Sequence, residues 1–260
     1  MARGLGCWGM APSRSAEVYG DFLLPHLTRE THLIDLGCGS GELSLELAAE
    51  VGRLTGIDED TAEIASARAA AAASSVGNAD FEVGDAYALG LPDDGVDAVL
   101  GHSVLEALDR PGDALDEMRR VLRPGGIVAV ASVEYGGLVL AGPDAPLLRR
   151  FYEIRERLWL AEGADPYLGR ELRGLLIGHG FTRVRASTTY VCYGDEAAVR
   201  EFGLGRADDC VDDWYVESAQ RHGLATPHDL ERMRHAWLTW ADSPSSYAAF
   251  AWCRALGWTA

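Results

Sequence analysis

The sequence predicts an α/β fold in which helices cover both faces of a doubly wound parallel sheet. Two observations carry this prediction: short apolar runs alternate with amphipathic segments at regular spacing, and a glycine-rich turn directly follows the first strong apolar run. The length of 260 residues allows one α/β domain with elaborations. A hydrophobic content of 48% and a charged content of 24% are ordinary for a globular protein with a substantial core.

The first half of the chain alternates regularly between the two kinds of element. Residues 14–24 are expected to form a helix, because Val18 and Phe22 are four residues apart and Pro25 follows. A Pro-Gly-Gly sequence at 124–126 is expected to stop the helix that begins at Pro111. The other expected elements are strands at 32–37, 53–58, 79–86, within 91–101 and at 127–133, and helices at 42–51 and 60–73.

The second half is predicted to be mainly helical. Helices are expected at 144–162 and 168–179, followed by a strand at 182–192 and, after about fifty residues, a last strand at 247–258. Within that interval Thr226 and Pro227 have the pattern of a helix start. The interval therefore predicts a helical insertion into the sheet domain, placed to cover a site.

Charge and cysteine content exclude several function classes. The net charge of −17 disfavours nucleic acid and anionic membranes as partners, because a surface this acidic repels phosphate. The chain contains no lysine, which removes Schiff-base chemistry, and its 5 cysteines form no CxxC pair, so no zinc site is expected. Asp208, Asp209, Asp212 and Asp213 fit acids at a helix start and need no ion. Without a signal-peptide pattern or a long apolar segment, we expect a cytoplasmic protein.

The glycine turn in "HLIDLGCGSGEL" (32–43) marks a candidate ligand site. Ligands of open parallel sheets bind beyond the carboxyl ends of the strands, where bare backbone permits close approach. Asp58 and Asp85 each end a later strand, where a carboxylate can accept hydrogen bonds from ribose hydroxyls or an adenine amino group. Asp35 would repel a pyrophosphate but attract an ammonium and a sulfonium.

These motifs resemble the class I S-adenosylmethionine-dependent methyltransferases, especially the subfamily related to quinone-biosynthesis C-methyltransferases. The resemblance runs from about residue 14 to 190, plus the final strand. Its motifs are "LIDLGCGSG", "GID", "FEVGDAYALGLPDDGVDAVLGHSVLEAL" and "RRVLRPGG". It implies a Rossmann-like, seven-stranded sheet with the last strand antiparallel, and S-adenosylmethionine as cofactor with S-adenosylhomocysteine as product and no metal.

The resemblance also implies the cofactor contacts. Gly37, the Cys38 backbone and Gly39 would line the methionine portion, Asp58 the ribose, and Asp85 the adenine amino group. Tyr19 on the first helix would close over the ligand, although a Tyr that points into the core is an equal alternative. The full set of expected cofactor residues is Arg14, Tyr19, Asp35, Gly37, Cys38, Gly39, Gly41, Asp58, Glu59, Asp85, Ala86 and His102.

The acceptor side is expected near the ends of the fourth and fifth strands. His102 and Glu134 are the candidate catalytic residues, with the alternative that His102 only hydrogen-bonds the cofactor or a neighbouring loop. Glu106 is expected to be an acid on a helix surface. The candidate substrate-binding residues are Tyr135, Tyr152, Arg170 and Trp237. For Trp237 a buried stripe with Leu230, Met233 and Trp240 is the favoured interpretation.

The predicted organisation has three parts: an N-terminal helix in 1–30 that closes over the cofactor, a cofactor-binding core in 31–143, 168–193 and 246–260, and helical insertions in 144–167 and 194–245 that form the lid and acceptor pocket. The expected function is methyl transfer in secondary metabolism to a small molecule, natural-product or quinone-like, with the accepting atom (C, N or O) and the oligomeric state left open. "GHSV" stands where nucleobase amino-methyltransferases carry an Asn/Asp-Pro-Pro-aromatic motif.

Three alternatives stay open from the sequence. The first is an S-adenosylmethionine-binding enzyme of the same fold that catalyses a cyclisation or rearrangement. The second, an NAD-dependent oxidoreductase, is disfavoured by Asp35 and by GxGxG in place of GxGxxG. The third is a nucleotide-binding module without catalysis.

Overall fold

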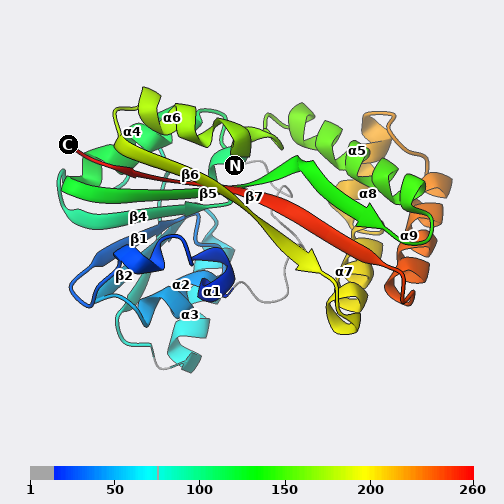
Figure 1. The fold of residues 1–260 in the computed structure, drawn as a ribbon, viewed down its shortest axis with the longest axis horizontal. Coiled ribbons are helices and arrows are strands. Elements are labelled where there is room, and N and C mark those ends of the chain that lie inside the picture. The colour runs from blue at the N-terminus through cyan, green and yellow to red at the C-terminus, as the bar shows by residue number, and fades with distance from the viewer. Residues whose placement is uncertain (1–14, 75) are drawn as a thin grey trace.

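A computed structural model describes residues 15–74 and 76–260 and contains one mixed sheet within them. The strand order is β3-β2-β1-β4-β5-β7-β6, and β7 runs antiparallel to both of its neighbours (Figure 1). This confirms the predicted Rossmann-like sheet of seven strands with the last strand antiparallel. The strands are β1 (His32–Leu36), β2 (Arg53–Asp58), β3 (Ala79–Val83), β4 (Val96–His102), β5 (Leu122–Ala141), β6 (Thr182–Tyr193) and β7 (Tyr247–Trp258).

Helices cover both faces of the parallel half, which is why its central strands are apolar on both sides. Leu33 and Ile34 of β1 are both fully buried although they point to opposite faces. One face packs against α1 (Ala16–Tyr19) and α2 (Glu42–Ala48), and the other against α4 (Pro111–Val121) and α6 (Leu172–Gly178), as Figure 1 shows. Near the β3 edge, α3 (Thr61–Ser74) packs on Phe81.

The N-terminal helix is shorter than the sequence predicts. The expected helix over 14–24 is instead α1, capped by Ser15 and ending at Gly20, followed by a 3-10 turn, η1 (Leu24–His26). The buried residues are Tyr19 and Leu23, whereas Val18 is exposed, so the expected Val18–Phe22 stripe is wrong. Glycine at position 20 favours termination there, and Asp21 beyond it forms an ion pair with Arg254 of β7.

The far ends of β5, β6 and β7 extend beyond the parallel sheet and carry a group of four helices, which we call the helical cap (Figure 1). Its members are α5 (Ala145–Ala161), α7 (Glu196–Asp209), α8 (Asp213–Arg221) and α9 (Pro227–Ala241). A capping box formed by Thr226 and Asp229 begins α9, in agreement with the predicted helix start. The cap lies beyond the carboxyl ends of β1, β4 and β5, which is where ligands bind in open sheets.

Large aromatic side chains fill the space inside the cap. Aromatic pairs with centroid separations of 4.3–6.0 Å connect α5, α7, α9, β6 and β7. The fully buried members are Phe151, Tyr152, Trp159, Tyr193, Phe202, Tyr215, Trp237, Trp240 and Phe250. The predicted buried stripe of Leu230, Met233, Trp237 and Trp240 on α9 is therefore confirmed.

A carboxylate buried between two arginines connects α5 to α7. Asp209 Oδ2 accepts from Arg155 at 3.1 Å and forms an ion pair with Arg206 at 3.2 Å. Both arginines are buried, so their charge is compensated inside the cap rather than by solvent. The prediction that Asp208 and Asp209 start a helix is wrong, because both end α7; Asp212 caps α8 instead.

Replacing Asp209 should destabilise the cap strongly. Asp209→Ala would leave two buried guanidinium groups facing each other without the carboxylate, and we expect a loss of about 3–5 kcal/mol in the free energy of unfolding. Urea unfolding monitored by tryptophan fluorescence measures this change. Asp208→Ala, at the neighbouring exposed position, is the matched control and should change the unfolding free energy by less than about 0.5 kcal/mol. Equal effects of the two variants would contradict this assignment.

Candidate functional site

The glycine turn between β1 and α2 is held against the end of β2. The backbone N–H groups of Gly37 and Cys38 both donate to Ile57 O, at 2.7 and 3.2 Å. Gly39 N donates to Asp58 Oδ2 at 2.9 Å. The turn is thus tied to the adjacent strand by main-chain and carboxylate acceptors, and its position follows from the parallel β1–β2 pairing.

The three glycines of the turn serve different purposes. Gly37, Gly39 and Gly41 all have positive φ, at 73°, 53° and 81°, which side chains rarely adopt. A Cβ on Gly37 would lie 2.8 Å from Val104 Cβ, and one on Gly41 would lie 2.9 Å from the Phe81 ring. Within the described chain, a Cβ on Gly39 would meet nothing nearer than Glu63 Oε2 at 3.9 Å. Gly37 and Gly41 are required by packing, and only Gly39 faces open space.

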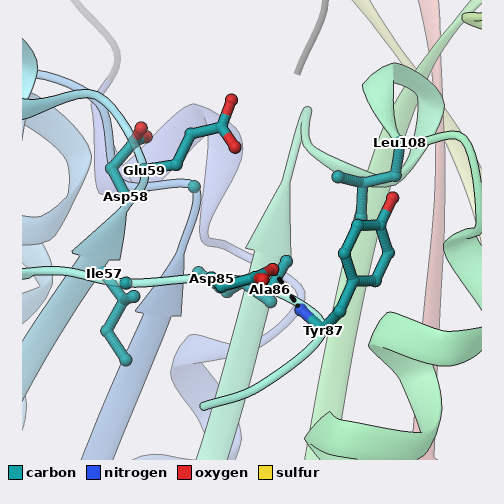
Figure 2. Close-up of a pocket in the computed structure, with 10 residues that line it drawn as sticks. Ile57, Asp58, Glu59, Asp85, Ala86, Tyr87 and Leu108 are labelled. Carbon is teal, nitrogen blue, oxygen red and sulfur yellow. Dashed lines mark hydrogen bonds between the residues drawn. The ribbon is translucent and has the colours of Figure 1, made fainter. Parts of the chain in front are cut away.

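A pocket opens beside this turn at the ends of β1, β2 and β3 (Figure 2). It contains about 300 Å³ of space between atoms, part of which is open to solvent. Asp58 and Glu59 line one side, and Asp85, Ala86 and Tyr87 another. The complete lining is Leu36, Gly37, Ile57, Asp58, Glu59, Gly84, Asp85, Ala86, Tyr87 and Leu108. The structure brings together all the residues predicted from the second and third strand ends.

The two strand-end acids are oriented by backbone donors. Asp58 Oδ1 accepts from Asp60 N at 3.0 Å, in addition to the bond from Gly39. Asp85 Oδ1 accepts from Tyr87 N at 2.8 Å, drawn in Figure 2, and its side chain is exposed to the pocket opening. These contacts keep each carboxylate in a defined direction while unused acceptor capacity stays available to hydroxyl or amino groups of a ligand.

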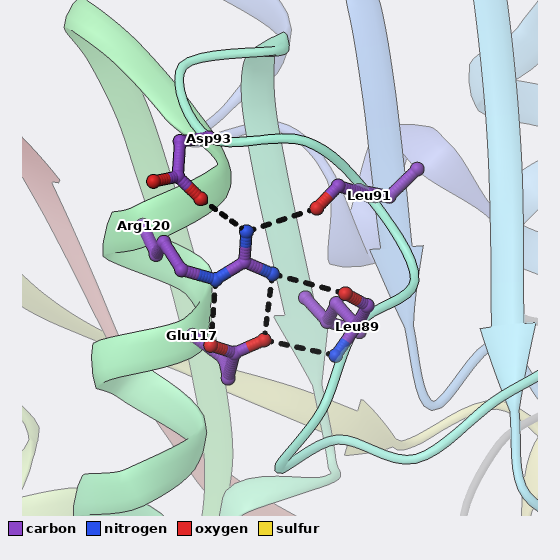
Figure 3. A network of polar contacts seen from close by, with 5 residues as sticks. All are labelled: Leu89, Leu91, Asp93, Glu117 and Arg120. Carbon is purple, nitrogen blue, oxygen red and sulfur yellow. Dashed lines mark hydrogen bonds and ion pairs between the residues drawn. The ribbon is translucent and has the colours of Figure 1, made fainter.

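Arg120 of α4 fixes the segment that follows Asp85 (Figure 3). Its guanidinium donates five hydrogen bonds, two to the Glu117 carboxylate at 2.7 and 2.8 Å, two to the carbonyls of Leu89 and Leu91 at 2.9 Å, and one to Asp93 at 2.6 Å. Glu117 also accepts from Leu89 N. The hydrogen bonds from Arg120 lower the pKa of Glu117 below its ordinary value. Arg120, the second arginine of the "RRVLRPGG" motif, therefore anchors the loop that directly follows the pocket-lining residues Asp85, Ala86 and Tyr87.

Below the turn, Asp35 and Cys38 are both buried and play no surface role. Ser44 Oγ donates to Asp35 Oδ2 at 2.5 Å, which joins β1 to α2 beneath the glycines. Burial, reinforced by the charges of Asp35 and Asp58, raises the pKa of the Cys38 thiol well above its ordinary value. The thiol is therefore protonated and unsuited to nucleophilic chemistry, in keeping with the expected backbone role.

His102 ends β4 inside an aromatic cluster. Its ring stacks on Trp252 with centroids 4.7 Å apart and meets the edge of Tyr19 at 5.1 Å. The side chain is only 3% exposed. Tyr19 is buried and packs beside His102 and Trp252, as in the alternative of a tyrosine that points into the core. Closure of Tyr19 over a ligand stays a prediction. Trp252 was missed by the sequence analysis; the alternation of Phe250 and Trp252 in β7 was the available signal.

Glu106 corrects an expectation. It is not on a helix surface but 1% exposed, in the 3-10 turn η2 (Leu105–Ala107). Ser103 Oγ and Ser132 Oγ donate to its two carboxylate oxygens at 2.9 and 2.7 Å. Ser132 comes from β5, so the burial of Glu106 depends on a strand 26 positions further along the chain.

The predicted acceptor residues divide into two groups. Glu134 is buried at a bulge of β5 and accepts two hydrogen bonds from Arg170, whose side chain is 56% exposed and also lies over the Tyr167 ring. Arg170 belongs to the 3-10 turn η3 (Leu168–Glu171). These two charged residues form a rim between β5 and the segment before α6.

Tyr152 and Trp237 do not lie at an accessible surface. Both are buried in the aromatic core of the cap, about 6.0 Å apart, and burial raises the pKa of Tyr152 far above its ordinary value. The expectation that they contact an acceptor is corrected: their role here is packing, because α5 and α9 turn these faces toward each other. Tyr135 is also buried, against Tyr152 and Trp159, while Arg14 lies outside the described residues.

The described residues contain no group of three or more histidine, cysteine, aspartate or glutamate side chains arranged to hold a metal ion. In the same part of the chain, no helix has the length and apolar character needed to cross a bilayer.

Comparisons with known proteins connect this geometry to a family. Residues 27–154 match a family described as a methyltransferase domain. A probable methyltransferase, ltbC, from Aspergillus luteorubrus is 38% identical over 128 residues, 45% of each chain. The 2-phytyl-1,4-naphtoquinone methyltransferase of Synechococcus elongatus is 36% identical over 138 residues, 51% of this chain and 55% of that one. The matches thus span about half the length of these relatives.

Solved structures support the fold. The YcgJ protein of Bacillus subtilis superposes with a TM-score of 0.61 over 94% of this chain and 98% of its own, at 16% identity. At this identity the similarity establishes the arrangement of the sheet and helices.

Two glycine variants should separate ligand contact from packing. Gly39→Ala and Gly41→Ala share the cost of an alanine at positive φ, about 1 kcal/mol. Only Gly41→Ala also collides with the Phe81 ring, so we expect it to lose about 3 kcal/mol or more in unfolding free energy. Gly39→Ala should instead weaken S-adenosylmethionine binding at least about tenfold. Thermal unfolding measures the stability effect, and titration calorimetry measures the binding effect. Unchanged S-adenosylmethionine affinity in Gly39→Ala would contradict the expectation that Gly39 contacts the ligand.

The Glu117–Arg120 contact should make stability depend on pH. Because the pKa of Glu117 is lowered on folding, its contribution is complete above about pH 4.5 and disappears as the pH falls through the lowered pKa. Relative to the parent, Glu117→Gln should lose about 1–2 kcal/mol at pH 7, and the difference should shrink below pH 4.5. Urea unfolding from pH 7 to pH 3 measures this, with the exposed Glu82→Gln as control. A difference that stays constant with pH would refute the assignment.

Proposed function

The chain belongs to the class I S-adenosylmethionine-dependent methyltransferases, and on this basis we propose that it transfers the methyl group of S-adenosylmethionine to a small-molecule acceptor. The observation that carries the proposal is the meeting of three features at consecutive strand ends. Gly37 of the glycine turn lines the same pocket as Asp58 and Asp85, and the N–H of the open Gly39 donates to the Asp58 carboxylate. An adenosine-bearing cation fits a site with bare backbone and acidic walls.

Each part of the cofactor has a proposed partner. Asp58 and Glu59 would accept hydrogen bonds from the ribose hydroxyls, and Asp85 and the Ala86 amide would bind the adenine edge. The turn at Gly37, Cys38 and Gly39 would accommodate the methionine portion, with Gly41 closing the turn. Asp35 stabilises the turn through Ser44 and adds a negative charge near the ammonium and sulfonium groups.

The reaction demands alignment more than acid–base chemistry. Methyl transfer is an in-line displacement at the sulfonium carbon, so holding donor and acceptor in near-attack geometry supplies most of the rate. We place the acceptor between His102 and the Glu134–Arg170 rim, with Tyr135 behind it. His102 could assist deprotonation of an acidic acceptor, since imidazole titrates near neutral pH.

The acceptor class is proposed from the relatives and from surface charge. One relative is named for a phytyl-naphthoquinone, and another is a probable methyltransferase of a fungus. The first name supports a quinone-like acceptor, and the second states no acceptor. We extend the proposal to a natural-product acceptor in secondary metabolism. The net charge of −17 disfavours nucleic acid and anionic membranes as partners. A cytoplasmic location and a metal-free reaction are also part of the proposal.

The test combines binding with transfer of a label. S-adenosylmethionine should bind the parent protein in titration calorimetry, and Asp85→Asn should weaken the affinity at least about tenfold, about 1.4 kcal/mol. Asp80→Asn, at the 64%-exposed position on β3, is the matched control and should bind like the parent. Equal affinity of Asp85→Asn and the parent would exclude this adenine site.

The second step uses methyl-deuterated S-adenosylmethionine and a broad small-molecule extract, with products analysed by mass spectrometry. We expect labelled product and S-adenosylhomocysteine only with active protein, and the labelled compound identifies the accepting atom. Cofactor binding with altered extract components but without label or S-adenosylhomocysteine would instead support the cyclisation or rearrangement alternative.

A further inference from the structure

Glu106 is a carboxylate buried at the carboxyl edge of the sheet, where the sequence predicts a surface acid. It is 1% exposed and lies in η2, directly after the turn that ends β4. Removing a carboxylate from water costs several kcal/mol unless hydrogen bonds replace the solvent. Burying such a residue lowers the stability of the fold, so we look for a role other than packing.

Three segments of the chain meet at Glu106. Ser103 Oγ, in the turn after β4, donates to Oε1 at 2.9 Å, and Ser132 Oγ of β5 donates to Oε2 at 2.7 Å. The backbone carbonyl of Glu106 accepts from Asp165 N at 2.8 Å, in the segment between α5 and η3. One residue thus connects the end of β4 and the middle of β5 to the segment that follows α5 of the helical cap.

The hydrogen bond to Ser103 holds a strained backbone. Ser103 has a φ of 59°, a conformation that costs a non-glycine residue about 1 kcal/mol or more. Its N–H donates to Ala131 O at 2.8 Å, so both its backbone and its side chain are fixed from β5 and Glu106. The strained turn immediately follows His102 and sets the direction in which β4 ends.

The same turn touches both sides of the site. His102 stacks on Trp252 at 4.7 Å, and Val104 lies so close to the glycine turn that a Cβ on Gly37 would come within 2.8 Å of it. Movement of residues 102–104 would therefore shift His102 and the wall of the cofactor turn together. Interiors packed this closely transmit such shifts rather than absorb them.

We propose that Glu106 is a positioning residue for the reaction: through Ser103 and Ser132 it holds the turn 102–104 against the glycine turn and sets the placement of acceptor relative to methyl donor. The effect on catalysis rests on the proposed function. The placement of the turn 102–104 by Glu106 does not depend on it. Both carboxylate oxygens accept from serine hydroxyls, which favours a role through other residues over direct proton transfer.

The structural part is tested by the imidazole resonances of His102. The stacked indole should shift the His102 Cε1–H signal upfield of the other histidines, and His102→Gln assigns the signal among the 7 histidines of the chain. Glu106→Ala should remove this shift, whereas Glu106→Gln, which can still hydrogen-bond both serines, should retain it. Ser246→Ala is the matched control, because it removes another buried serine hydroxyl with a 2.7 Å bond, inside the cap. An unchanged His102 signal in Glu106→Ala would overturn the proposal.

The kinetic part uses the acceptor identified by the labelling experiment. We expect Glu106→Ala to lower kcat about 10- to 100-fold, a larger change than its loss of S-adenosylmethionine affinity. Ser132→Ala, which leaves Ser103 in place, covers the case in which Glu106→Ala does not fold, and should show a smaller loss. Glu106→Gln should restore most of the rate. A Glu106→Gln protein as slow as Glu106→Ala, with a flattened pH profile, would make Glu106 a base and overturn the positioning role.

The two parts fail separately. The resonance measurement needs neither cofactor nor acceptor, so a parent protein that transfers no methyl group would refute the proposed function and leave the test of Glu106 intact.

Discussion

The site depends on the attachment of the glycine turn to the last two residues of β2. Ile57 O accepts the N–H groups of Gly37 and Cys38, and the Asp58 carboxylate accepts that of Gly39. A turn with three positive-φ glycines has little order of its own, because glycine loses more conformational freedom than any other residue. Parallel pairing of β1 with β2 supplies the hydrogen-bond acceptors, so the sheet orders the glycine turn. The ordered turn then places one open glycine, Gly39, beside the pocket.

Carboxylates organise the surroundings of this turn in different ways according to their burial. Asp35 and Glu106 are enclosed and satisfied by serine hydroxyls, whereas Asp85 is oriented by one backbone N–H and opens to the pocket. The enclosed acids cost desolvation and give fixed geometry in return. The open acid keeps acceptor capacity for a ligand. The acidic character of the chain is thus partly built into the site and not only spread over the surface.

The helical cap is stabilised by a different kind of interaction. Tilted and edge-to-face aromatic rings from α5, α7, α9 and β7 form one core, and the Asp209 carboxylate compensates two buried arginines. Aromatic cores of this kind bury large apolar areas in defined orientations. The cap is therefore a packed body beyond the strand ends. Its boundary with the sheet, where Glu134 and Arg170 are found, is where we propose that an acceptor enters.

The sequence by itself determined the sheet, the glycine turn and the strand-end acids, because each depends on residues that are close together in the chain. Alternating apolar runs specify parallel strands, and Asp58 and Asp85 take their positions directly from the strands that they end. The buried stripe on α9 followed from helical periodicity in the same way. These features need no knowledge of which distant segments meet.

Only the tertiary structure decided the environment of the remaining residues. Glu106 is buried because Ser132 of β5 reaches it. His102 is enclosed because Trp252, on a strand from the other end of the chain that pairs with β5, stacks on its ring. Tyr152 and Trp237 became core residues when α5 and α9 packed face to face. Periodicity shows which face of a helix or strand is apolar. Segments far away in sequence determine what covers that face. They also determine whether an acid at its edge contacts water or a serine.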